Sequence, residues 1–441
     1  MTTKSRNLLM STDSYKQTHH VQYVPGLEYV YSYFEPRKGA IYKDIVWMGV
    51  IPYIKEYGLD GYAFEHYDIL EAVKICDEHF GVPGYFNEKG WRYILDTYAG
   101  RLPLRISQLP AGTIVKPGTP CMAIENTDPK VPWLTNYVES ILMHVYASTN
   151  TATISYDVYK TIKKWADRCG ECVSPVHLND FGLRGSSSLQ SAETCGMGHL
   201  LIFSGSDNIP SIKCAMECYS SGVVGVSVIA AEHSTITSWG KENEFVAYSH
   251  IIKTAPDSAI ISLVIDSFDW KNAIDTMFCG NLRDLILSRS GKVVCRPDSE
   301  DHIINVPYIL KKLWEVYGGS INKNGYKVLD PHIGIIVGDG VNVNIIDSIY
   351  YIIVNDGFAP SNVIWGSGGY LLQQHDRDTL GFAFKCSAIR RNGIWYDVKK
   401  TTPGKESKAG RFPELEVVYE NGVILKDESF TEIRNRIRGV L

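Results

Sequence analysis

The feature that most constrains the fold is a repeated pattern, in which an apolar segment stops at a polar or glycine-rich tip and a mostly helical stretch follows. Successive tips lie roughly thirty residues apart, which is the length of one βα unit. Apolar strands that alternate with helices predict a parallel sheet covered on both faces, and seven units in series favour an irregular (β/α) barrel. The tips read HLNDFGLRG (177–185), LLIFSGSDN (200–208), VSVIAAEH (226–233), ISLVIDSFD (261–269), KVVCRPDS (292–299), GIIVGDG (334–340) and NVIWGSGG (362–369).

A barrel also predicts where the chemistry lies, because such barrels build their active sites at the carboxyl ends of the strands. The apolar run 228–231 should be buried, and it ends in Glu232 and His233. The last two tips, GDG at 338–340 and GSGG at 366–369, are glycine turns whose backbone N–H groups suit a phosphate. We therefore expect one shared pocket, lined by Asp180, Asp207, His233, Asp266, Arg296, Asp298 and Asp339.

The residue types at the tips indicate the class of ligand. Arg184 and Arg296, together with the glycine turns, suit a ligand that carries more than one phosphate. Carboxylates in the same pocket suit Mg²⁺, and the Phe181 ring offers a face for a flat ligand. These groups favour a phosphorylated sugar and an aromatic base over a peptide or a lipid.

Residue types alone leave several alternatives open. His233 is consistent with a structural histidine, with a general acid–base, or with a nucleophile that becomes phosphorylated. The other polar groups have plain alternatives as helix caps, ion pairs or solvated surface residues: Asp266, Asp269, Asp298 with Arg296, Arg377, and the basic loop 399–411.

The first 150 residues differ from the repeating region. They are rich in aromatic residues, and the stretch 102–128 alternates strand-like runs with Gly and Pro turns. We expect a separate α+β domain at residues 1–150. The tail 389–441 contains further strand-like runs and is expected to pack back on it, which leaves residues 151–388 as the barrel domain.

Charge and composition argue against several other classes. The formal net charge of −5 argues against a nucleic-acid partner. No apolar run is long enough to span a bilayer, and no secretory signal is expected at the N-terminus. The ten cysteines lack zinc-ribbon spacing, so we expect reduced thiols in a cytoplasmic protein.

Seven motifs in order give the chain a family resemblance that runs from about residue 7 to the C-terminus. The chain resembles the nicotinamide phosphoribosyltransferase family, which are type II phosphoribosyltransferases. The motifs are STDSYKQTHH (11–20), DFGLRG (180–185), AAEHSTITSWG (230–240), DSFD (266–269), SRS (288–290) with RPDS (296–299), GDGV (338–341) and GSGGYLLQ (366–373).

The resemblance implies a reaction and its requirements. Members of this family join nicotinamide to 5-phosphoribosyl-1-pyrophosphate, and release nicotinamide mononucleotide and pyrophosphate in NAD salvage. The family requires Mg²⁺, held mainly by the pyrophosphate rather than by direct protein ligands. ATP hydrolysis is coupled through a phosphorylated histidine, which His233 matches. Members of the family form homodimers with shared active sites.

The resemblance also implies roles for individual residues. The base slot matches Phe181 and Tyr15 of the partner subunit, and Asp207 matches the residue that faces the carboxamide. The matching catalytic set is His233, Asp207, Arg296, Asp298 and Asp266. The matching contacts to pyrophosphate, nucleotide and phosphate are Arg184, Gly338, Asp339, Gly368, Gly369 and Arg377, with Arg37, Lys385, Lys400 and Lys405 from across the dimer.

Three other hypotheses stay open at this point. A nicotinate phosphoribosyltransferase would use the same fold and prefer the acid. A non-catalytic protein of this fold would bind nicotinamide and phosphate without turnover. A barrel aldolase or isomerase of phosphosugars is the third, although a Schiff-base aldolase needs a lysine at a strand tip and none of the seven tips ends in one.

Overall fold

The computed structural model describes residues 7–299, 301–403 and 406–441. The chain forms two compact units. Unit 1 comprises the residues up to 153 together with 215–222 and those from 375 onward, and unit 2 comprises 154–214 and 223–374. Each unit is described by itself.

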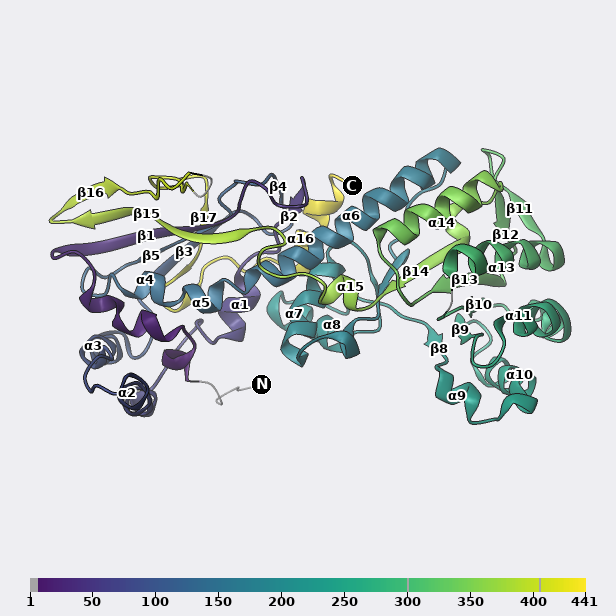
Figure 1. Ribbon diagram of the computed structural model, residues 1–441, viewed down its shortest axis with the longest axis horizontal. Coiled ribbons are helices and arrows are strands. Elements are labelled where there is room, and N and C mark those ends of the chain that lie inside the picture. The colour runs from purple at the N-terminus through teal and green to yellow at the C-terminus, as the bar shows by residue number, and fades with distance from the viewer. Residues whose placement is uncertain (1–6, 300, 404–405) are drawn as a thin grey trace. The chain divides into compact units, whose positions relative to one another are not determined.

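Unit 2 is built on a seven-stranded parallel sheet with the order β7-β6-β14-β13-β10-β9-β8 (Figure 1). Each of the seven tips expected from the sequence follows one of these strands. The strands are β6 (Leu178–Asp180), β7 (Gly205–Ser206), β8 (Ile229–Ala230), β9 (Ile261–Val264), β10 (Val293–Arg296), β13 (Ile333–Val337) and β14 (Val363–Ser367).

The two ends of this sheet meet next to β8. Val226, which leads into β8, forms a parallel bridge with Gly205 of β7. The Ser206 amide donates to the Val226 carbonyl at 2.9 Å, and the Val226 amide donates to the Ser204 carbonyl at 2.8 Å. This pairing returns the sheet onto itself, so the expected irregular (β/α) barrel is confirmed.

Burial along the strands follows the apolar runs, with one exception. All residues of β9 and β13 are buried, as expected for strands covered on both faces. The expectation that 228–231 is buried was wrong for most of the run, since Val228 and Ile229 are 38% and 44% exposed and only Ala231 is buried. β8 comprises only two residues and is the last strand in the sheet order, unlike the interior strands β9 and β13.

Helices cover the other strands of unit 2. In α14, Ile346, Ile349, Tyr350 and Ile353 recur at helical spacing and are buried, and the Tyr350 hydroxyl accepts from Trp365 Nε1 of β14 at 2.7 Å. The unit also contains a hairpin of β11 (Gly319–Ile321) and β12 (Lys327–Leu329). The helices that lie wholly or mostly in this unit are α6 (Val145–Cys169), α7 (Leu189–Leu200), α8 (Ile209–Cys218), α9 (His233–Thr237), α10 (Glu244–Thr254), α11 (Trp270–Asn272) with a π-helical continuation (Ala273–Asn281), α12 (Arg283–Leu287), α13 (His302–Tyr317), α14 (Val343–Asn355) and α15 (Gly369–Leu372).

Unit 1 is an α+β unit with a seven-stranded antiparallel sheet of order β16-β15-β1-β5-β3-β17-β18. One face packs the rings of Tyr31 and Tyr33 against Phe412, and the other packs Phe34 against Trp47 and Phe382. The strands are β1 (Leu27–Pro36), β3 (Leu104–Gln108), β5 (Met122–Asn126), β15 (Phe382–Arg391), β16 (Ile394–Asp397), β17 (Glu416–Glu420) and β18 (Val423–Ile424), with β2 (Ile45–Val46) and β4 (Ile114–Val115) forming a separate pair.

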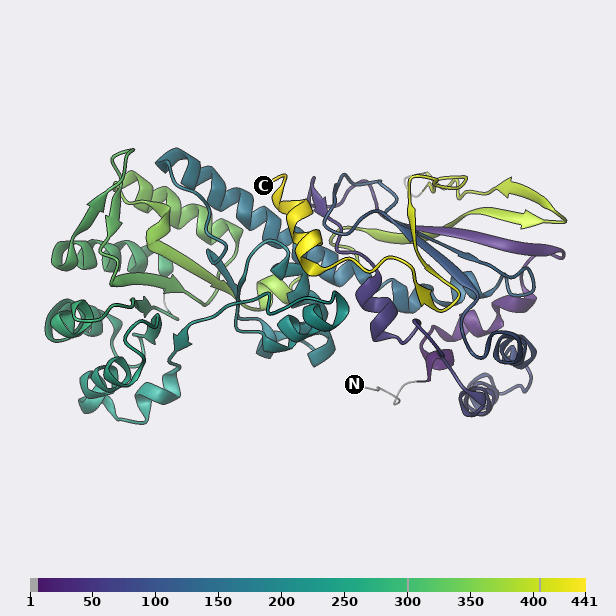
Figure 2. The same cartoon turned by 180° about the vertical axis from the view of Figure 1, so that it is seen from behind.

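The helices of unit 1 flank this sheet, with α2 and α3 on one side of it in both views (Figure 2). The Glu65 side chain and Asp68 form a capping box at the start of α2, which satisfies two otherwise free amides. The helices are α1 (Ile51–Glu56), α2 (His66–Phe80), α3 (Glu88–Tyr98), α4 (Leu134–Tyr137), α5 (Glu139–Leu142) and α16 (Phe430–Arg438).

The C-terminal tail joins unit 1, as the fold class required, because β16, β17 and β18 extend the sheet that contains β1. The change-over expected at residue 389 falls inside β15, which pairs with β1 along its length, and the chain enters unit 1 at about residue 375. Residues 215–222 also belong to unit 1, where the Tyr219 hydroxyl donates to the Met48 carbonyl at 3.3 Å. Across the described parts of the chain, no helix has the length and apolarity needed to cross a membrane.

Candidate active site

The strand order of unit 2 brings the predicted tip residues to one edge of the barrel. The strands are parallel, so their carboxyl ends lie together. The residues carried to this edge are Phe181 and Arg184 after β6, Asp207 after β7, His233 after β8, Asp266 after β9, Arg296 and Asp298 at β10, Gly338 and Asp339 after β13, and Gly368 and Gly369 after β14.

His233 and Asp266 form the central contact of this edge. His233 is the first residue of α9, and its Nε2 lies 3.3 Å from Asp266 Oδ1. The imidazole is 45% exposed, whereas the carboxylate is only 3% exposed. The other carboxylate oxygen accepts the Asp298 amide at 3.3 Å and the Ser299 hydroxyl. A buried and firmly held acid therefore orients a solvent-accessible imidazole.

Arg296 connects the tips of two strands. Its Nη2 donates to the Ala231 carbonyl at 3.0 Å, which ties β10 to the segment before His233. Its Nε lies 4.0 Å from Asp298 Oδ1, beyond hydrogen-bond distance, and this buried nitrogen has no hydrogen-bond partner among the described residues. The ion pair considered from the sequence is thus a loose one.

The Phe181 ring lies across the ends of β13 and β14. A Cβ atom at Gly366 would come within 2.0 Å of the ring carbon Cε2, and one at Gly338 would come within 3.4 Å. The same point at Gly338 lies 3.3 Å from Asp298 Oδ1. Glycine at position 366 is what allows the half-buried ring to lie against these strand ends.

Asp180 was among the expected pocket residues, and the structure buries it at the end of β6. Its carboxylate is buried and accepts the Gly182 amide at 2.8 Å and Asn208 Nδ2 at 3.0 Å. Burial raises the pKa of Asp180 to about 6, and the nearby Asp207 adds to the rise, while the two hydrogen bonds oppose it. Asp180 holds the turn that carries Phe181.

Hydroxyl groups next to the acids were missed from the sequence. The Ser227 hydroxyl donates to Asp207, as the Ser299 hydroxyl does to Asp266. In each case a serine lies close to a strand tip, and this is the only sequence signal that would have found them. Arg184 is exposed in the 3₁₀ turn Leu183–Gly185.

The two glycine turns differ in their surroundings. A Cβ atom at Gly369 would meet nothing within 4 Å, so this turn has open space in front of it. Gly340 has a φ of +62°, a conformation that favours glycine and completes the turn after β13.

Asp269 has the helix-capping role considered from the sequence, since its side chain accepts the Asn272 amide at 2.9 Å.

Predicted phosphate contacts of unit 1 form a second group. Arg37 Nε donates to the Gly381 carbonyl at 2.8 Å, and Lys385 lies opposite Tyr33 in the β1–β15 pair. The pKa of Lys385 is lowered by burial and by the nearby cations Lys400, Arg37 and Arg377, and Glu139 opposes the change. The structure therefore brings Lys400, Arg37 and Arg377 within electrostatic reach of Lys385. Lys405 lies outside the described residues.

Tyr15 and Arg377 line one hollow of unit 1. It has a volume of about 520 Å³ and also contacts Asp13, Ser140 and His144. Tyr15 is 56% exposed, and Arg377 is half exposed with an ion pair to Asp378 at 3.0 Å. The exposure of Arg377 agrees with the alternative of a solvated surface arginine, and its guanidinium also borders this hollow.

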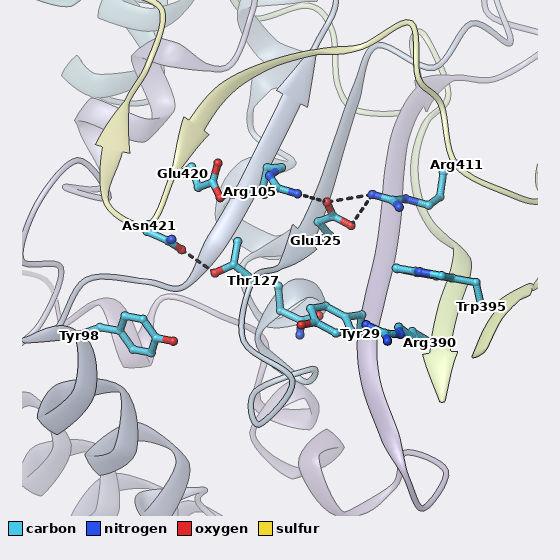
Figure 3. Close-up of a pocket in the computed structure, with 11 residues that line it drawn as sticks. Tyr29, Tyr98, Arg105, Glu125, Thr127, Arg390, Trp395, Arg411, Glu420 and Asn421 are labelled. Carbon is cyan, nitrogen blue, oxygen red and sulfur yellow. Dashed lines mark hydrogen bonds and ion pairs between the residues drawn. The ribbon is translucent and has the colours of Figure 1, made fainter. Parts of the chain in front are cut away.

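Another hollow of unit 1, of about 340 Å³, contains none of the predicted site residues (Figure 3). Glu125 accepts a hydrogen bond from Arg105 Nη1 at 2.9 Å. Arg411 Nη2 donates to both carboxylate oxygens of Glu125, at 2.9 and 3.1 Å, and Arg105 also pairs with Glu420. The Arg411 guanidinium lies 4.7 Å from the centre of the Trp395 ring. Because charge and ring faces are already matched here, we assign this hollow a structural role.

The acids of the barrel edge suit Mg²⁺ that is held mainly by a substrate, and do not form a cage of protein ligands. Among the residues with described positions, no group of three histidine, cysteine or carboxylate side chains is arranged to hold a metal. The Asp266 carboxylate already contacts His233 and accepts the Asp298 amide and the Ser299 hydroxyl, whereas Asp298 and Asp339 carry their carboxylates beside or within the turn after β13. Mg²⁺ typically binds one or two carboxylates plus phosphate oxygens of a substrate, and Asp298 and Asp339 are the residues that would contribute here.

Fold and edge together define a barrel enzyme that acts on a phosphorylated substrate. Comparison with known proteins specifies the class. The model of the nicotinate phosphoribosyltransferase (NAPRTase) family matches residues 176–431, and the model of the nicotinamide phosphoribosyltransferase N-terminal domain matches residues 7–106. The chain therefore belongs to the nicotinate phosphoribosyltransferase family.

Individual relatives agree with this assignment. The chain is 41% identical to the nicotinamide phosphoribosyltransferase of Xanthomonas campestris pv. campestris over 416 residues, which cover 93% of this chain and 87% of that protein. It is 31% identical to the nicotinamide phosphoribosyltransferase of Acinetobacter baylyi over an aligned length of 493 residues, with 98% and 97% covered.

The fold is shared with solved structures at low sequence identity. Human nicotinic acid phosphoribosyltransferase aligns with a TM-score of 0.62 at 14% identity, covering 97% of this chain and 92% of that chain. Nicotinate-nucleotide pyrophosphorylase from Pyrococcus furiosus aligns with a TM-score of 0.59 at 15% identity, covering 99% and 96%. At this identity the similarity concerns the fold.

Proposed function

We propose that this phosphoribosyltransferase transfers the 5-phosphoribosyl group of phosphoribosyl pyrophosphate to nicotinamide, and so forms nicotinamide mononucleotide and pyrophosphate for NAD salvage. The observation that carries the proposal is the position of Phe181 of the expected base slot, whose ring lies against Gly366 beside Gly338 at the barrel edge. The curated relatives named as nicotinamide phosphoribosyltransferases support the choice of base.

The slot selects the base by stacking and by charge. An electron-poor pyridine ring stacks on Phe181, and the carboxamide faces Asp207. A carboxylate accepts a hydrogen bond from an –NH₂ group but repels a second carboxylate, so Asp207 favours nicotinamide over nicotinic acid. The Ser227 hydroxyl donates to Asp207 and fixes the orientation of this carboxylate.

Transfer needs charge stabilisation on both sides of the breaking bond. The bond from the anomeric carbon to pyrophosphate breaks while the pyridine nitrogen attacks, through a state in which the ribose ring is positive and the leaving group negative. Arg184 and Arg296 stabilise the leaving group, and Asp298 offsets the positive ring. Mg²⁺, held mainly by pyrophosphate oxygens with Asp298 and Asp339 nearby, would neutralise the remaining phosphate charge.

His233 is the proposed phosphate acceptor in the coupled hydrolysis of ATP. Its Nε2 carries the proton that is donated to Asp266, so in the neutral ring the lone pair is on Nδ1. Nδ1 attacks the γ-phosphorus, the bond to ADP breaks, and water later hydrolyses the N–P bond. The 45% exposure of the imidazole leaves it accessible to a nucleotide, as this step requires.

The active form is proposed to be a homodimer with shared sites. The exposed apolar side chains around β8 support this, because a second copy would bury Val223, Val226, Val228 and Ile229. The partner subunit's Tyr15 would complete the base slot, and the partner subunit's Arg37, Lys385 and Lys400 would add phosphate contacts. A cytoplasmic location stays a prediction.

A turnover assay tests the proposal. Purified protein is incubated with Mg²⁺, phosphoribosyl pyrophosphate and nicotinamide, with or without ATP, and the products are quantified by mass. We expect nicotinamide mononucleotide and pyrophosphate in equal amounts, with ATP raising the yield in the wild type but not in His233→Ala. Folded protein that binds nicotinamide and yields no mononucleotide would instead support a binding protein of the same fold.

A further inference from the structure

The first turn of α13 contacts the turn after β13 through His302. This histidine is the first residue of the helix and is 8% exposed, and its Nε2 lies 3.0 Å from the Asp339 carbonyl oxygen. A carbonyl oxygen only accepts, so Nε2 must carry a proton and act as the donor. His302 therefore anchors the backbone of the glycine turn 338–340 to the helix.

Asn305 makes the corresponding contact to the loop after β10. It lies one helical turn beyond His302, is 1% exposed, and its Nδ2 donates to the Ser299 carbonyl at 3.2 Å. The Ser299 hydroxyl in turn donates to Asp266, which contacts His233. The same helical turn thus holds two loops of the active-site edge, from strands that are neighbours in the sheet.

The helix that carries both side chains is itself well fixed. The Asp301 carboxylate accepts the Ile303 amide at 2.9 Å and caps α13, and Val306, Ile309 and Leu310 are fully buried. Residues three apart on a helix lie on the same face, so His302 and Asn305 act side by side. Two positions on one rigid element set the spacing of two loops more precisely than contacts between the loops would.

The role of each side chain lies in its donor group. His302 Nδ1 and Asn305 Oδ1 are buried and have no hydrogen-bond partner within the described part of the chain. The acceptor atoms contribute nothing to the contact with either loop, whereas each N–H donor meets a backbone carbonyl. A replacement that keeps the donor should therefore keep the function, and one that keeps only the volume should not.

We propose that His302 and Asn305 are positioning residues that hold the loop Asp298–Ser299 and the turn Gly338–Gly340 at the spacing needed for the phosphorylated substrate. This inference rests on the proposed function, because it assigns the two loops to the phosphoribosyl pyrophosphate side of that site. Asp207 is carried by β7, which is not adjacent to β10 or β13, so the carboxamide contact does not depend on them.

The first test compares His302→Leu, which removes the donor, with His302→Gln, whose amide N–H keeps a donor at similar reach. Ile304→Ala is the matched control, because Ile304 is exposed in the same helical turn. Hydrogen exchange is followed in peptide 334–342, with peptide 363–372 as the internal reference. We expect exchange in peptide 334–342 to be roughly two- to tenfold faster in His302→Leu, as the loss of one such hydrogen bond requires, and unchanged in the other two variants.

The second readout is steady-state kinetics of the same proteins. His302→Leu should raise KM for phosphoribosyl pyrophosphate by roughly two- to tenfold and KM for nicotinamide by a smaller factor, since Gly338 of the same turn borders the Phe181 ring, and His302→Gln should restore both values. If His302→Leu does not fold, Asn305→Leu, which also removes the donor, takes its place, and exchange is then followed in the peptide that contains residues 296–299.

The outcomes separate this inference from the proposed function. A wild type that forms no nicotinamide mononucleotide contradicts the proposed function, and the exchange data still decide on the positioning role. Equal exchange in 334–342 for wild type and His302→Leu would overturn the inference, even in a fully active enzyme. A glutamine variant that behaves like the leucine variant would overturn it as well.

Discussion

His233 Nε2 and Asp266 Oδ1 lie 3.3 Å apart, with the imidazole open to solvent and the carboxylate buried beneath it. The carboxylate is held from below by the Asp298 amide and the Ser299 hydroxyl. The ring is therefore oriented from the protein side while its outer nitrogen stays accessible. This is the geometry that a histidine needs to act as a phosphate acceptor rather than as a core residue.

Replacing Asp266 with asparagine should reduce ATP stimulation. An asparagine keeps the size of the side chain, but it has no charge and only one acceptor oxygen. Its –NH₂ group must therefore face either the imidazole or the Asp298 amide and Ser299 hydroxyl, all of which now donate to Asp266. We expect the rise in product formation caused by ATP to fall by about tenfold, with the ATP-independent reaction less affected. Turnover with and without ATP measures both. An unchanged ATP stimulation would contradict a role for the pair.

Gly366→Ala should damage base binding. The new methyl group would lie within 2.0 Å of the Phe181 ring, so the ring has to leave its position. We expect KM for nicotinamide to rise by about tenfold or more, in line with the loss of a stacking contact. Gly280→Ala is the control, because a Cβ there comes no nearer than 4.0 Å to other atoms and Gly280 is far from the tips in sequence. Equal nicotinamide KM values for both variants would refute the slot.

Asp207→Ser should relax the preference for the amide over the acid. The substitution removes the negative charge that repels nicotinic acid, while a hydroxyl still accepts from the carboxamide. The ratio of kcat/KM for nicotinamide to that for nicotinic acid should drop by about tenfold or more. Initial rates with each base give this ratio. A wild type that already prefers nicotinic acid would contradict the assignment of Asp207.

Asp180 should make stability depend on pH in the mildly acidic range. Its pKa is raised mainly by burial, to about 6 in the folded chain, so the folded state binds this proton more tightly than the unfolded state. The stabilisation is fully present below the ordinary carboxyl pKa and is lost as the pH rises through 6. The loss for this group is about 3 kcal/mol.

Urea unfolding between pH 4 and pH 7 measures this term. Asp180→Asn cannot titrate, so its free energy of unfolding should lack this downward slope. Asp284→Asn is the control, because Asp284 is a highly exposed carboxylate, and it should keep the wild-type slope. Parallel slopes in wild type and Asp180→Asn would show that the buried carboxylate does not titrate in this window.

Shared sites predict recovery of activity when two inactive variants are mixed. Lys385→Met changes unit 1 and Arg296→Met changes unit 2, so a mixed dimer with shared sites has one intact site. After unfolding and refolding an equal mixture, we expect about a quarter of wild-type activity. A mixture of Arg296→Met with Asp207→Ala, both in unit 2, should recover nothing. No recovery in the first mixture would contradict a shared site.

The barrel and its edge were predictable because each strand is a continuous apolar run that ends in a polar tip. In β9 and β13 a mostly apolar run coincides with full burial. Asp266 follows β9 after one further residue, and Gly338 follows β13 directly. This pattern is local in sequence. It needs no knowledge of which strand is adjacent to which.

Features that depend on long-range partners were not predictable in the same way. Val228 and Ile229 are exposed around β8, the last strand in the sheet order, and no local pattern shows which strand takes that place. His302 and Asn305 bond to backbone carbonyls of Asp339 and Ser299, and a carbonyl has no signature in the sequence. Their side chains look like ordinary first-turn helix residues until the fold is known.

The most direct test of the central claim is a competition for the base. Nicotinamide and nicotinic acid are supplied together at equal concentration, with phosphoribosyl pyrophosphate, Mg²⁺ and ATP, and the two mononucleotides are quantified by mass in the initial phase. The account predicts that nicotinamide mononucleotide is the main product. Nicotinic acid mononucleotide as the main product would contradict it, and would make this chain a nicotinate phosphoribosyltransferase in activity.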